Sequence, residues 1–275
     1  MRDLPWRNTR DRWSVLVSEV MAQQTQLSRV VPKYVLFMRE YPTVGDCAAA
    51  PLADLLRLWS GLGYPRRCKN LHDAARHIVA HHNSQVPGDV HTLQSLPGIG
   101  PYTARAVMAF ADGIDVAVVD TNVARVLARV TNTSLSARQS QELADEMLPR
   151  GQAWEWNQVM MDFGATVCTA RKAHCEGCPV FAQCVWKGGV DNEIDPAKTS
   201  AFTSKPQAKF AGSDRQARGK LMKALTVSGV SQERLVAVME IADAERALRL
   251  AQALVKEGLV EYSSQGYQLP SAMPK

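Results

Sequence analysis

Hydrophobic positions along most of the chain recur every three to four residues, the spacing of a helix with one buried face. The pattern is clear over residues 13–24, 51–63, 66–82, 103–111, 121–130, 136–148 and 154–165. Before residue 257, strand-like composition is confined to the four residues 116–119. The pattern therefore predicts an all-α body over residues 12–185.

A different composition follows this helical body. Residues 187–214 are poor in large apolar side chains and rich in Gly, Pro, Ser and Lys, so we predict a linker. Three short helical patterns come next, around 215–226, 231–239 and 243–257, and two β-prone runs then flank Ser-Ser-Gln-Gly. Helices followed by a hairpin predict a small winged-helix-like domain over 215–275, with a plain helical cap as the alternative.

Length, composition and charge narrow the class of protein. The chain has 275 residues, 46% of them hydrophobic, which predicts a packed core rather than disorder. Its net charge of +5 favours polyanionic partners. Apolar runs fall short of the ~20 residues of a membrane span, and the basic, polar N-terminus is unlike a signal peptide. We expect no membrane partner and a cytoplasmic location, on the nucleoid in a bacterium.

Four of the six cysteines form a tight group with the spacing C-x6-C-x2-C-x5-C, namely Cys168, Cys175, Cys178 and Cys184. In a reducing compartment, grouped thiols more often bind a metal than form disulfides. Four thiols within 17 residues can converge on one centre, either a tetrahedral zinc or an iron–sulfur cluster. The other two, Cys47 and Cys68, lie in helical patterns and are predicted to be packing residues.

Two carboxylates stand out by their surroundings. Glu19 is the only charged side chain between Trp13 and Ser28, and apolar neighbours would raise its pKa. Asp120 precedes a helix, where it could simply be the N-cap and where the helix dipole should lower its pKa. Two carboxylates with pKa values driven apart suit cleavage of a glycosidic bond, which needs a proton donor and an anion beside the sugar cation.

The segment LPGIG, residues 96–100, lies between two helical patterns. Gly98 and Gly100 permit a tight turn and a close backbone approach, and the following helix offers N–H groups to an anion. This arrangement predicts a helix-hairpin-helix that binds a DNA phosphate. Nearby, Arg66, Arg67 and Lys69 are either phosphate contacts or a solvated run of charges.

Taken in order, these motifs resemble the adenine DNA glycosylases of the MutY type, in the helix-hairpin-helix base-excision superfamily. The matching segments are LPWR (4–7), SEVMAQQTQ (18–26), GLGYPRR (61–67), LPGIGPYTA (96–104), VDTNVARVLARV (119–130), NQVMMDFGATVC (157–168) and the cysteine run. The resemblance, over about residues 2–186, implies two helical lobes: a six-helix barrel over 12–125, and an iron–sulfur lobe formed by 1–11 and 126–186. It also replaces zinc by one 4Fe–4S cluster as the expected cofactor.

The resemblance implies catalytic roles for four residues. Glu19 matches the general acid that protonates adenine, and Asp120 matches the carboxylate that stabilises the sugar cation. Tyr102 and Asn122 match the pocket residues that orient these groups. Strand-cutting relatives carry a lysine nucleophile at the position of Tyr102, and a phenol cannot form an imine. The resemblance therefore implies a monofunctional glycosylase without lyase activity.

The resemblance also implies how DNA is bound. Gln24 matches a residue wedged into the duplex, Tyr64 matches one near the orphaned guanine, and Gly98 and Gly100 match the phosphate-binding hairpin. The expected partner is double-stranded DNA with adenine opposite 8-oxoguanine or guanine, bound by a monomer. The adenine would be flipped out of the helix, at a cost of a few kcal/mol of stacking and pairing.

Two alternatives and two departures from the family remain. A mismatch glycosylase for thymine or uracil opposite guanine would share Tyr102 and the aspartate, but SEVMAQQT is the adenine-type sequence around Glu19. A non-catalytic DNA-damage-binding protein would not need both carboxylates.

The chain starts at Met1 without the helical stretch that precedes LPWR in the family, which predicts a trimmed start or a reduced lobe. Residues 215–275 are too short for the Nudix-like domain that recognises 8-oxoguanine in many members, so base removal is predicted but not lesion discrimination.

Overall fold

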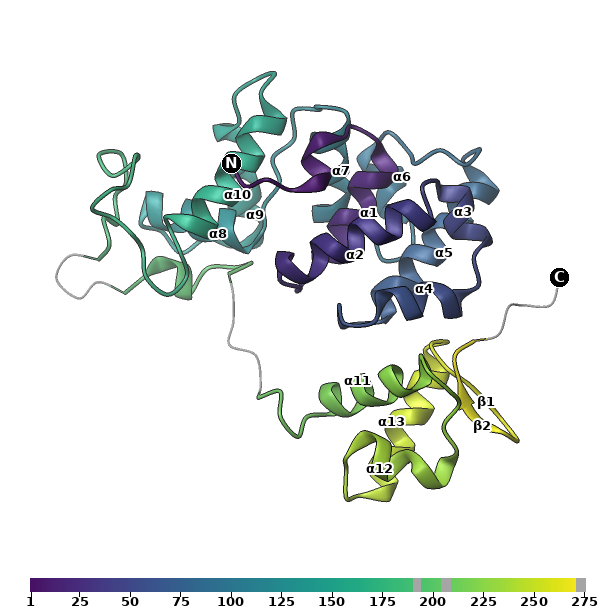
Figure 1. The fold of residues 1–275 in the computed structure, drawn as a ribbon. Coiled ribbons are helices and arrows are strands. Elements are labelled where there is room, and N and C mark those ends of the chain that lie inside the picture. The colour runs from purple at the N-terminus through teal and green to yellow at the C-terminus, as the bar shows by residue number, and fades with distance from the viewer. Residues whose placement is uncertain (190–193, 204–208, 271–275) are drawn as a thin grey trace. The chain divides into compact units, whose positions relative to one another are not determined.

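The computed structural model describes residues 1–189, 194–203 and 209–270. The part up to residue 189 is helical, and residues 116–119 lie in irregular backbone rather than in a strand, so the all-α prediction is confirmed (Figure 1). The elements of this part are η1 (Pro5–Asn8), α1 (Arg12–Ala22), α2 (Leu27–Glu40), α3 (Val44–Ala49), α4 (Leu52–Trp59), α5 (Arg66–His81), α6 (Val90–Ser95), α7 (Pro101–Ala111), α8 (Thr121–Thr131), α9 (Ala137–Met147) and α10 (Ala153–Thr166).

The chain divides into two compact units, and each contains segments from distant parts of the sequence. The first unit comprises Met1–Val15, Gly88–Gln94 and Ile99–Pro206, and the second comprises Leu16–Pro87, Ser95–Gly98 and Gln207–Lys275. Helix α7 thus belongs to the first unit, whereas the lobe boundaries expected from the sequence assign it to the barrel. Those lobe boundaries stay a prediction.

In the first unit, the N-terminal segment is anchored to α10 by one carboxylate. Asp162 accepts hydrogen bonds from the backbone N of Arg2 at 2.8 Å and from its Nε at 2.6 Å. It also accepts from the two terminal nitrogens of Arg7, at 2.9 and 2.8 Å. Burial opposes the charge on Asp162, but these bonds outweigh it and hold its pKa well below the usual range. The ion pairs therefore join η1 to α10.

In the second unit, α3 and α5 pack closely against each other and bury the two remaining cysteines. Cys47 is 0% exposed and Cys68 is 1% exposed, which confirms that they are packing residues. Burial raises the pKa of the Cys47 thiol to about 12 and raises that of Cys68 as well. Both thiols are therefore protonated at neutral pH.

The C-terminal segment folds as the predicted helices followed by a hairpin. Its elements are α11 (Asp214–Leu225), η4 (Gln232–Arg234), α12 (Leu235–Met239), α13 (Ala244–Lys256), β1 (Glu261–Ser263) and β2 (Gly266–Gln268). The two strands are antiparallel, with Tyr262 opposite Tyr267, and Val230 adds an isolated bridge to Tyr267. Gly266 has a φ of +103°, and a Cβ there would lie 2.5 Å from the Val230 carbonyl oxygen. The helices and hairpin are thus present, and the winged-helix-like assignment stays a prediction.

The linker predicted over 187–214 is wrong for its central part. The short helix η3 (Pro196–Lys198) packs against α8, and Pro196, Ala197 and Ser200 are buried. The composition did not predict this packing because the segment around η3 is attached largely through hydrogen bonds, and these leave no periodic pattern of apolar residues in the sequence. Positions 190–193 and 204–208 of the predicted linker lie outside the described residues.

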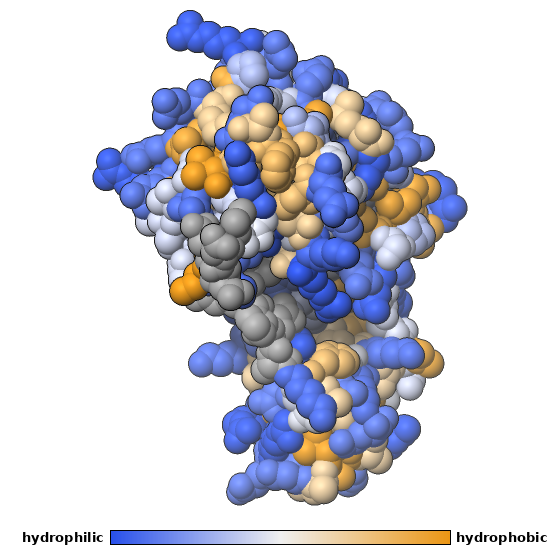
Figure 2. Space-filling view, turned by 90° about the vertical axis from the view of Figure 1, so that its left-hand side faces the viewer, coloured by the Kyte–Doolittle hydropathy of each residue, from blue (hydrophilic) through white to orange (hydrophobic). Residues whose placement is uncertain are grey.

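Hydrophilic side chains predominate on the face of the molecule drawn in Figure 2, with smaller apolar patches between them. Within the part of the chain that the structure describes, no helix combines the length and apolar character needed to cross a membrane.

Candidate catalytic carboxylates and cysteine centre

Asp120 is the N-cap of α8, as one interpretation of the sequence proposed. Its Oδ1 accepts hydrogen bonds from the backbone N of Asn122 at 2.8 Å and of Val123 at 2.7 Å, and its Oδ2 accepts from Asn122 Nδ2 at 2.9 Å. The expectation that its pKa is lowered is wrong. Burial raises the pKa of Asp120, and this loss of hydration outweighs the three hydrogen bonds. Asp120 is thus a partly buried carboxylate that also starts a helix.

The side chain of Asn122 is held between Asp120 and Arg125. Arg125 Nη2 donates to Asn122 Oδ1 at 2.9 Å and to the carbonyl oxygen of Gly164 at 2.6 Å, and its Nε donates to the carbonyl oxygen of Cys168 at 2.8 Å. A Cβ on Gly164 would lie 2.7 Å from the Asn122 Cβ, so α8 and α10 approach closely at this point. A chain of hydrogen bonds therefore runs from Asp120 to the start of the cysteine loop.

Arg125 and Arg129 were missed by sequence reasoning. Both lie in α8 at positions that are 5% and 3% exposed. The available signal was their spacing, four residues apart among the apolar positions of α8. Charged side chains on a buried helical face require internal partners, so this spacing could have marked them.

Glu19 lies in α1 and is 8% exposed. Its neighbours Leu16, Val17 and Met21 are each 0% exposed, which confirms the predicted glutamate in apolar surroundings. Glu19 belongs to the second unit and Asp120 to the first. Their meeting in one active site therefore stays a prediction.

The predicted helix-hairpin-helix is formed by α6, residues 96–100 and α7. Gly98 has a φ of +76°, and a Cβ there would lie 2.6 Å from the side chain of Asn70. This position therefore requires glycine. Gly100 is the N-cap of α7, with Pro101 as the first helical residue and the partly buried Tyr102 as the second. The exposed start of α7 presents backbone N–H groups, as a phosphate site needs.

Gln24 and Tyr64 lie in two loops of the second unit, each in the left-handed backbone region, with φ of 52° and 48°. Such conformations are costly for residues other than glycine and are held by their surroundings. Arg67 supports both loops: its terminal nitrogens donate at 2.7–3.1 Å to Val20 O, Met21 O, Thr25 Oγ1, Leu62 O and Gly63 O.

These bonds give Arg67 a role different from the predicted phosphate contact. Both terminal nitrogens are occupied inside the protein, and burial lowers its pKa to about 10. Lys69 pairs with Asp73 at 2.6 Å, one turn further along α5. Arg66 is exposed, and its phosphate contact stays a prediction.

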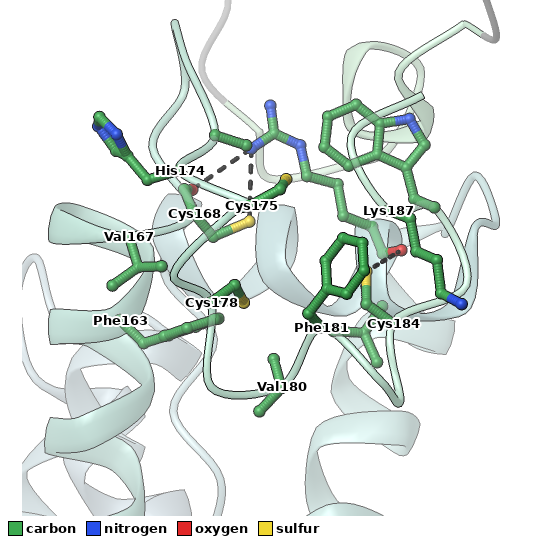
Figure 3. Close-up of a pocket in the computed structure, with 14 residues that line it drawn as sticks. Phe163, Val167, Cys168, His174, Cys175, Cys178, Val180, Phe181, Cys184 and Lys187 are labelled. Carbon is green, nitrogen blue, oxygen red and sulfur yellow. Dashed lines mark hydrogen bonds between the residues drawn. The ribbon is translucent and has the colours of Figure 1, made fainter. Parts of the chain in front are cut away.

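The four grouped cysteines line one pocket of the first unit and surround a common space (Figure 3). Burial raises the pKa of Cys175, and the other three cysteines add to the shift because their negative charges would oppose its own. Arg129 Nη1 lies 3.4 Å from Cys168 Sγ, so a positive charge faces the thiolate. Four thiols and a buried cation fit an anionic thiolate-bound centre.

The surroundings of the four thiols are apolar and closely packed. Among the described residues, no three His, Cys, Asp or Glu side chains converge closely enough for a single metal ion. The pocket is walled by apolar side chains, among them Phe163, Val167, Val180 and Phe181 (Figure 3). A Cβ on Gly188 would lie 3.1 Å from Cys175 Sγ, so the chain passes close over this thiol.

Comparisons with known proteins agree with this geometry. Residues 17–150 match the family described as "HhH-GPD superfamily base excision DNA repair protein". The chain is 41% identical over 271 residues to the adenine DNA glycosylase of Mycolicibacterium smegmatis, covering 96% of this chain and 90% of that protein.

Solved structures are similar over the helical body. The structure of a thermostable thymine-DNA glycosylase matches with a TM-score of 0.63 and 31% identity, over 68% of this chain and 88% of that one. A non-covalent Endonuclease III–DNA complex matches with a TM-score of 0.60 and 26% identity, over 64% and 84% of the two chains. With its helix-hairpin-helix and the near full-length match to the mycobacterial protein, the chain belongs to the helix-hairpin-helix superfamily of base-excision DNA repair proteins and, within it, to the adenine DNA glycosylases.

Proposed function

We propose that this glycosylase acts as a monomer on double-stranded DNA and hydrolyses the N-glycosidic bond of adenine opposite 8-oxoguanine or guanine. The observation that carries the proposal is the Asp120 carboxylate, held by three hydrogen bonds and backed by Asn122 and Arg125. Relatives that share this sequence over nearly their whole length are adenine DNA glycosylases.

Glu19 is the proton donor in this proposal. Adenine leaves easily only as a neutral base, so its ring must be protonated as the glycosidic bond breaks. Glu19 matches the general acid of the adenine DNA glycosylases by its motif position, and its side chain is 8% exposed with apolar neighbours along α1. Glu19 would then handle the proton of the attacking water as well.

Asp120 stabilises the sugar cation that develops as the base leaves. Because Asn122 accepts from Arg125 through Oδ1, its Nδ2 must face Asp120 Oδ2. This fixed amide orientation holds the carboxylate before substrate binds, and a preorganised anion needs no rearrangement in the transition state. Burial raises the pKa of Asp120, and a nearby cation would offset this cost of its charge, which supports the role proposed for it.

Tyr102 makes the reaction monofunctional. It is the second residue of α7, where the lyase relatives carry their lysine, and a phenol cannot form the imine of a lyase. Borohydride should therefore trap no covalent adduct between the protein and abasic DNA. A trapped adduct would overturn this part of the proposal.

The cysteine centre holds one 4Fe–4S cluster in this proposal, through Cys168, Cys175, Cys178 and Cys184, with zinc as the alternative. When bound, such a cluster cross-links the loop after α10 and can exchange an electron. The pocket supports the cluster because its four thiols surround a space and one of them, Cys168, is faced by Arg129 Nη1. Iron and sulfide analysis with the visible absorption band tests this assignment, and stoichiometric zinc would refute it.

A single-turnover assay tests the substrate. Duplexes with adenine, thymine or uracil opposite guanine or 8-oxoguanine are incubated with excess enzyme, and base release is followed by alkaline cleavage. Adenine should be released and the pyrimidines should stay. The thymine substrate is the critical comparison, because a thymine-DNA glycosylase shares the fold. Faster release of thymine or uracil would refute the adenine assignment.

A further inference from the structure

Arg129, at the last turn of α8, lies between the cysteine pocket and a segment beyond it. Its side chain is 3% exposed, and Nη1 donates to Cys168 Sγ at 3.4 Å and to Thr169 O at 2.8 Å. The guanidinium lies over the indole of Trp186, with Cζ 4.5 Å from the ring centre. A guanidinium buried this deeply requires a compensating anion.

That anion is Asp195, which follows the cysteine run. Its carboxylate accepts from Arg129 Nη2 at 2.7 Å and from Nε at 3.1 Å, the two-pronged geometry of strong arginine–carboxylate pairs. The Asp195 side chain is 14% exposed. Burial opposes its charge, but the bonds from Arg129 outweigh this and keep its pKa below the usual range. The pair is therefore charged on both sides.

The segment from Asp195 to Ala201, here called the strap, is bound at its two ends to Arg129 in α8 and to Leu135 just after α8. Asp195 Oδ1 accepts from Ala197 N at 3.0 Å and so starts η3 next to Arg129. At the other end, Ser200 Oγ accepts from Leu135 N at 3.0 Å, and Ala201 N donates to Leu135 O at 2.8 Å. Arg129 at one end and Leu135 at the other thus fix the position of Asp195.

The contacts link the strap to one ligand of the centre. Arg129 uses Nε and Nη2 for Asp195, and this leaves Nη1 directed at Cys168 and Thr169. A donor held on a thiolate fixes that sulfur in one orientation and offsets part of its negative charge, as outer-shell partners of metal ligands do. Without the carboxylate, the guanidinium keeps its bond to Thr169 O and its contact with Trp186 but loses the two bonds that direct Nη1 at the sulfur.

We propose that Asp195 is a positioning residue of the metal centre: through Arg129 it holds a hydrogen-bond donor on Cys168, and with the strap it keeps the metal in its pocket. The proposal rests on the metal centre proposed above. It does not involve the chemistry at Asp120 or Glu19, so retention of metal and release of adenine can fail independently.

Iron release from the full-length holoprotein tests the proposal. The wild type and Asp195→Asn are mixed anaerobically with a ferrous-iron chelator, and chelated iron and loss of the visible band are followed in time. Asn keeps the shape of the side chain and can still start η3, but it lacks the charge that orients Arg129. We expect release to be about tenfold faster, as is typical when a partner of a metal ligand is removed.

A matched control separates the strap from general loss of an ion pair. Asp145 in α9 accepts from Arg105 Nη1 at 2.8 Å and from Ala117 N at 3.0 Å, and it lies outside the residues that line the cysteine pocket. Asp145→Asn should release iron at the wild-type rate. Equal rates for Asp145→Asn and Asp195→Asn would overturn the proposal, whichever way both moved.

A double-mutant cycle with Arg129→Lys tests whether Asp195 acts through Arg129. Lysine keeps the charge but cannot bind Asp195 and Cys168 through separate prongs. Asp195→Asn should therefore accelerate release much less in the Arg129→Lys background, and additive effects would refute the proposed route. If the purified chain holds zinc, zinc release to a colorimetric chelator gives the same comparison. Adenine excision by the wild-type preparation separately tests the glycosylase proposal.

Discussion

Asp120→Asn should abolish most catalysis while leaving the fold intact. Asparagine is as good an N-cap as aspartate, so the bonds from Asn122 N and Val123 N can be kept. Folding raises the pKa of Asp120, so its ionised form costs stability, and this cost appears as pH rises through the folded pKa. A neutral asparagine removes that cost. Its Nδ2 would face Asn122 Nδ2 and lose that hydrogen bond, which offsets the gain, so the variant should melt close to the wild-type temperature at pH 7.5.

The catalytic loss follows from the missing charge. A carboxylate about 4 Å from a sugar cation contributes about 4 kcal/mol at an effective dielectric constant of about 20. Since about 1.4 kcal/mol corresponds to a tenfold change in rate, single-turnover adenine release should fall about a thousandfold. The wild-type rate should decline on acidification at a higher pH than an ordinary carboxyl group would give, because protonation of Asp120 removes the anion.

Two companion variants complete this test. Asp120→Ala loses the cap as well as the charge, so about 1 kcal/mol of stability and a few degrees of melting temperature should disappear with activity. Asp243 caps α13 by accepting from Arg246 N at 3.0 Å, and Asp243→Asn should retain the wild-type rate. Adenine release by Asp120→Asn within tenfold of wild type would refute the role assigned to Asp120.

Three further outcomes are expected. Asp162→Asn removes the carboxylate that pairs with Arg7 and Arg2, so the free energy of unfolding should fall by about 3 kcal/mol and the melting temperature by about 6–12 °C. Because the pKa of Asp162 is depressed, the difference from wild type should be complete at neutral pH and should shrink below about pH 4. A difference that does not change with pH would contradict the ion-pair explanation. Arg67→Lys should weaken binding to a mispaired duplex, measured by fluorescence anisotropy, because a single ammonium group cannot support both the Gln24 loop and the Tyr64 loop. The melting temperature should fall only slightly. Unchanged affinity would show that Arg67 does not contribute to DNA binding. Removing the metal with a chelator should increase proteolysis at residues 168–184 while Asp120→Asn does not, as followed by mass spectrometry of limited digests.

The sequence predicted what is periodic or locally encoded. The helices of the body, the helix-hairpin-helix and the C-terminal hairpin all follow from hydrophobic spacing and glycine placement, and the burial of Glu19 follows from its neighbours. The N-cap position of Asp120 was also readable, because a cap is decided within three residues.

What the sequence left out depends on contacts across long separations. The direction of the Asp120 pKa shift was mispredicted because the helix dipole is local, whereas the burial that outweighs it comes from tertiary packing. Asp195 looked like a linker residue because its partner Arg129 is 66 residues away. Arg67 looked like a surface cation because its five acceptors are mostly backbone oxygens, which have no sequence signature.

The burial of Cys47 and Cys68 gives the protein a clean chemical readout. Only thiolates react with alkylating reagents, and a pKa of about 12 leaves about one Cys47 in thirty thousand ionised at pH 7.5. Cys68 is unreactive as well, because it is 1% exposed and burial raises the pKa of its thiol. In the folded protein, maleimide labelling therefore reports on Cys168, Cys175, Cys178 and Cys184 alone. Four adducts mark a folded chain whose centre has been emptied, and six mark an unfolded one.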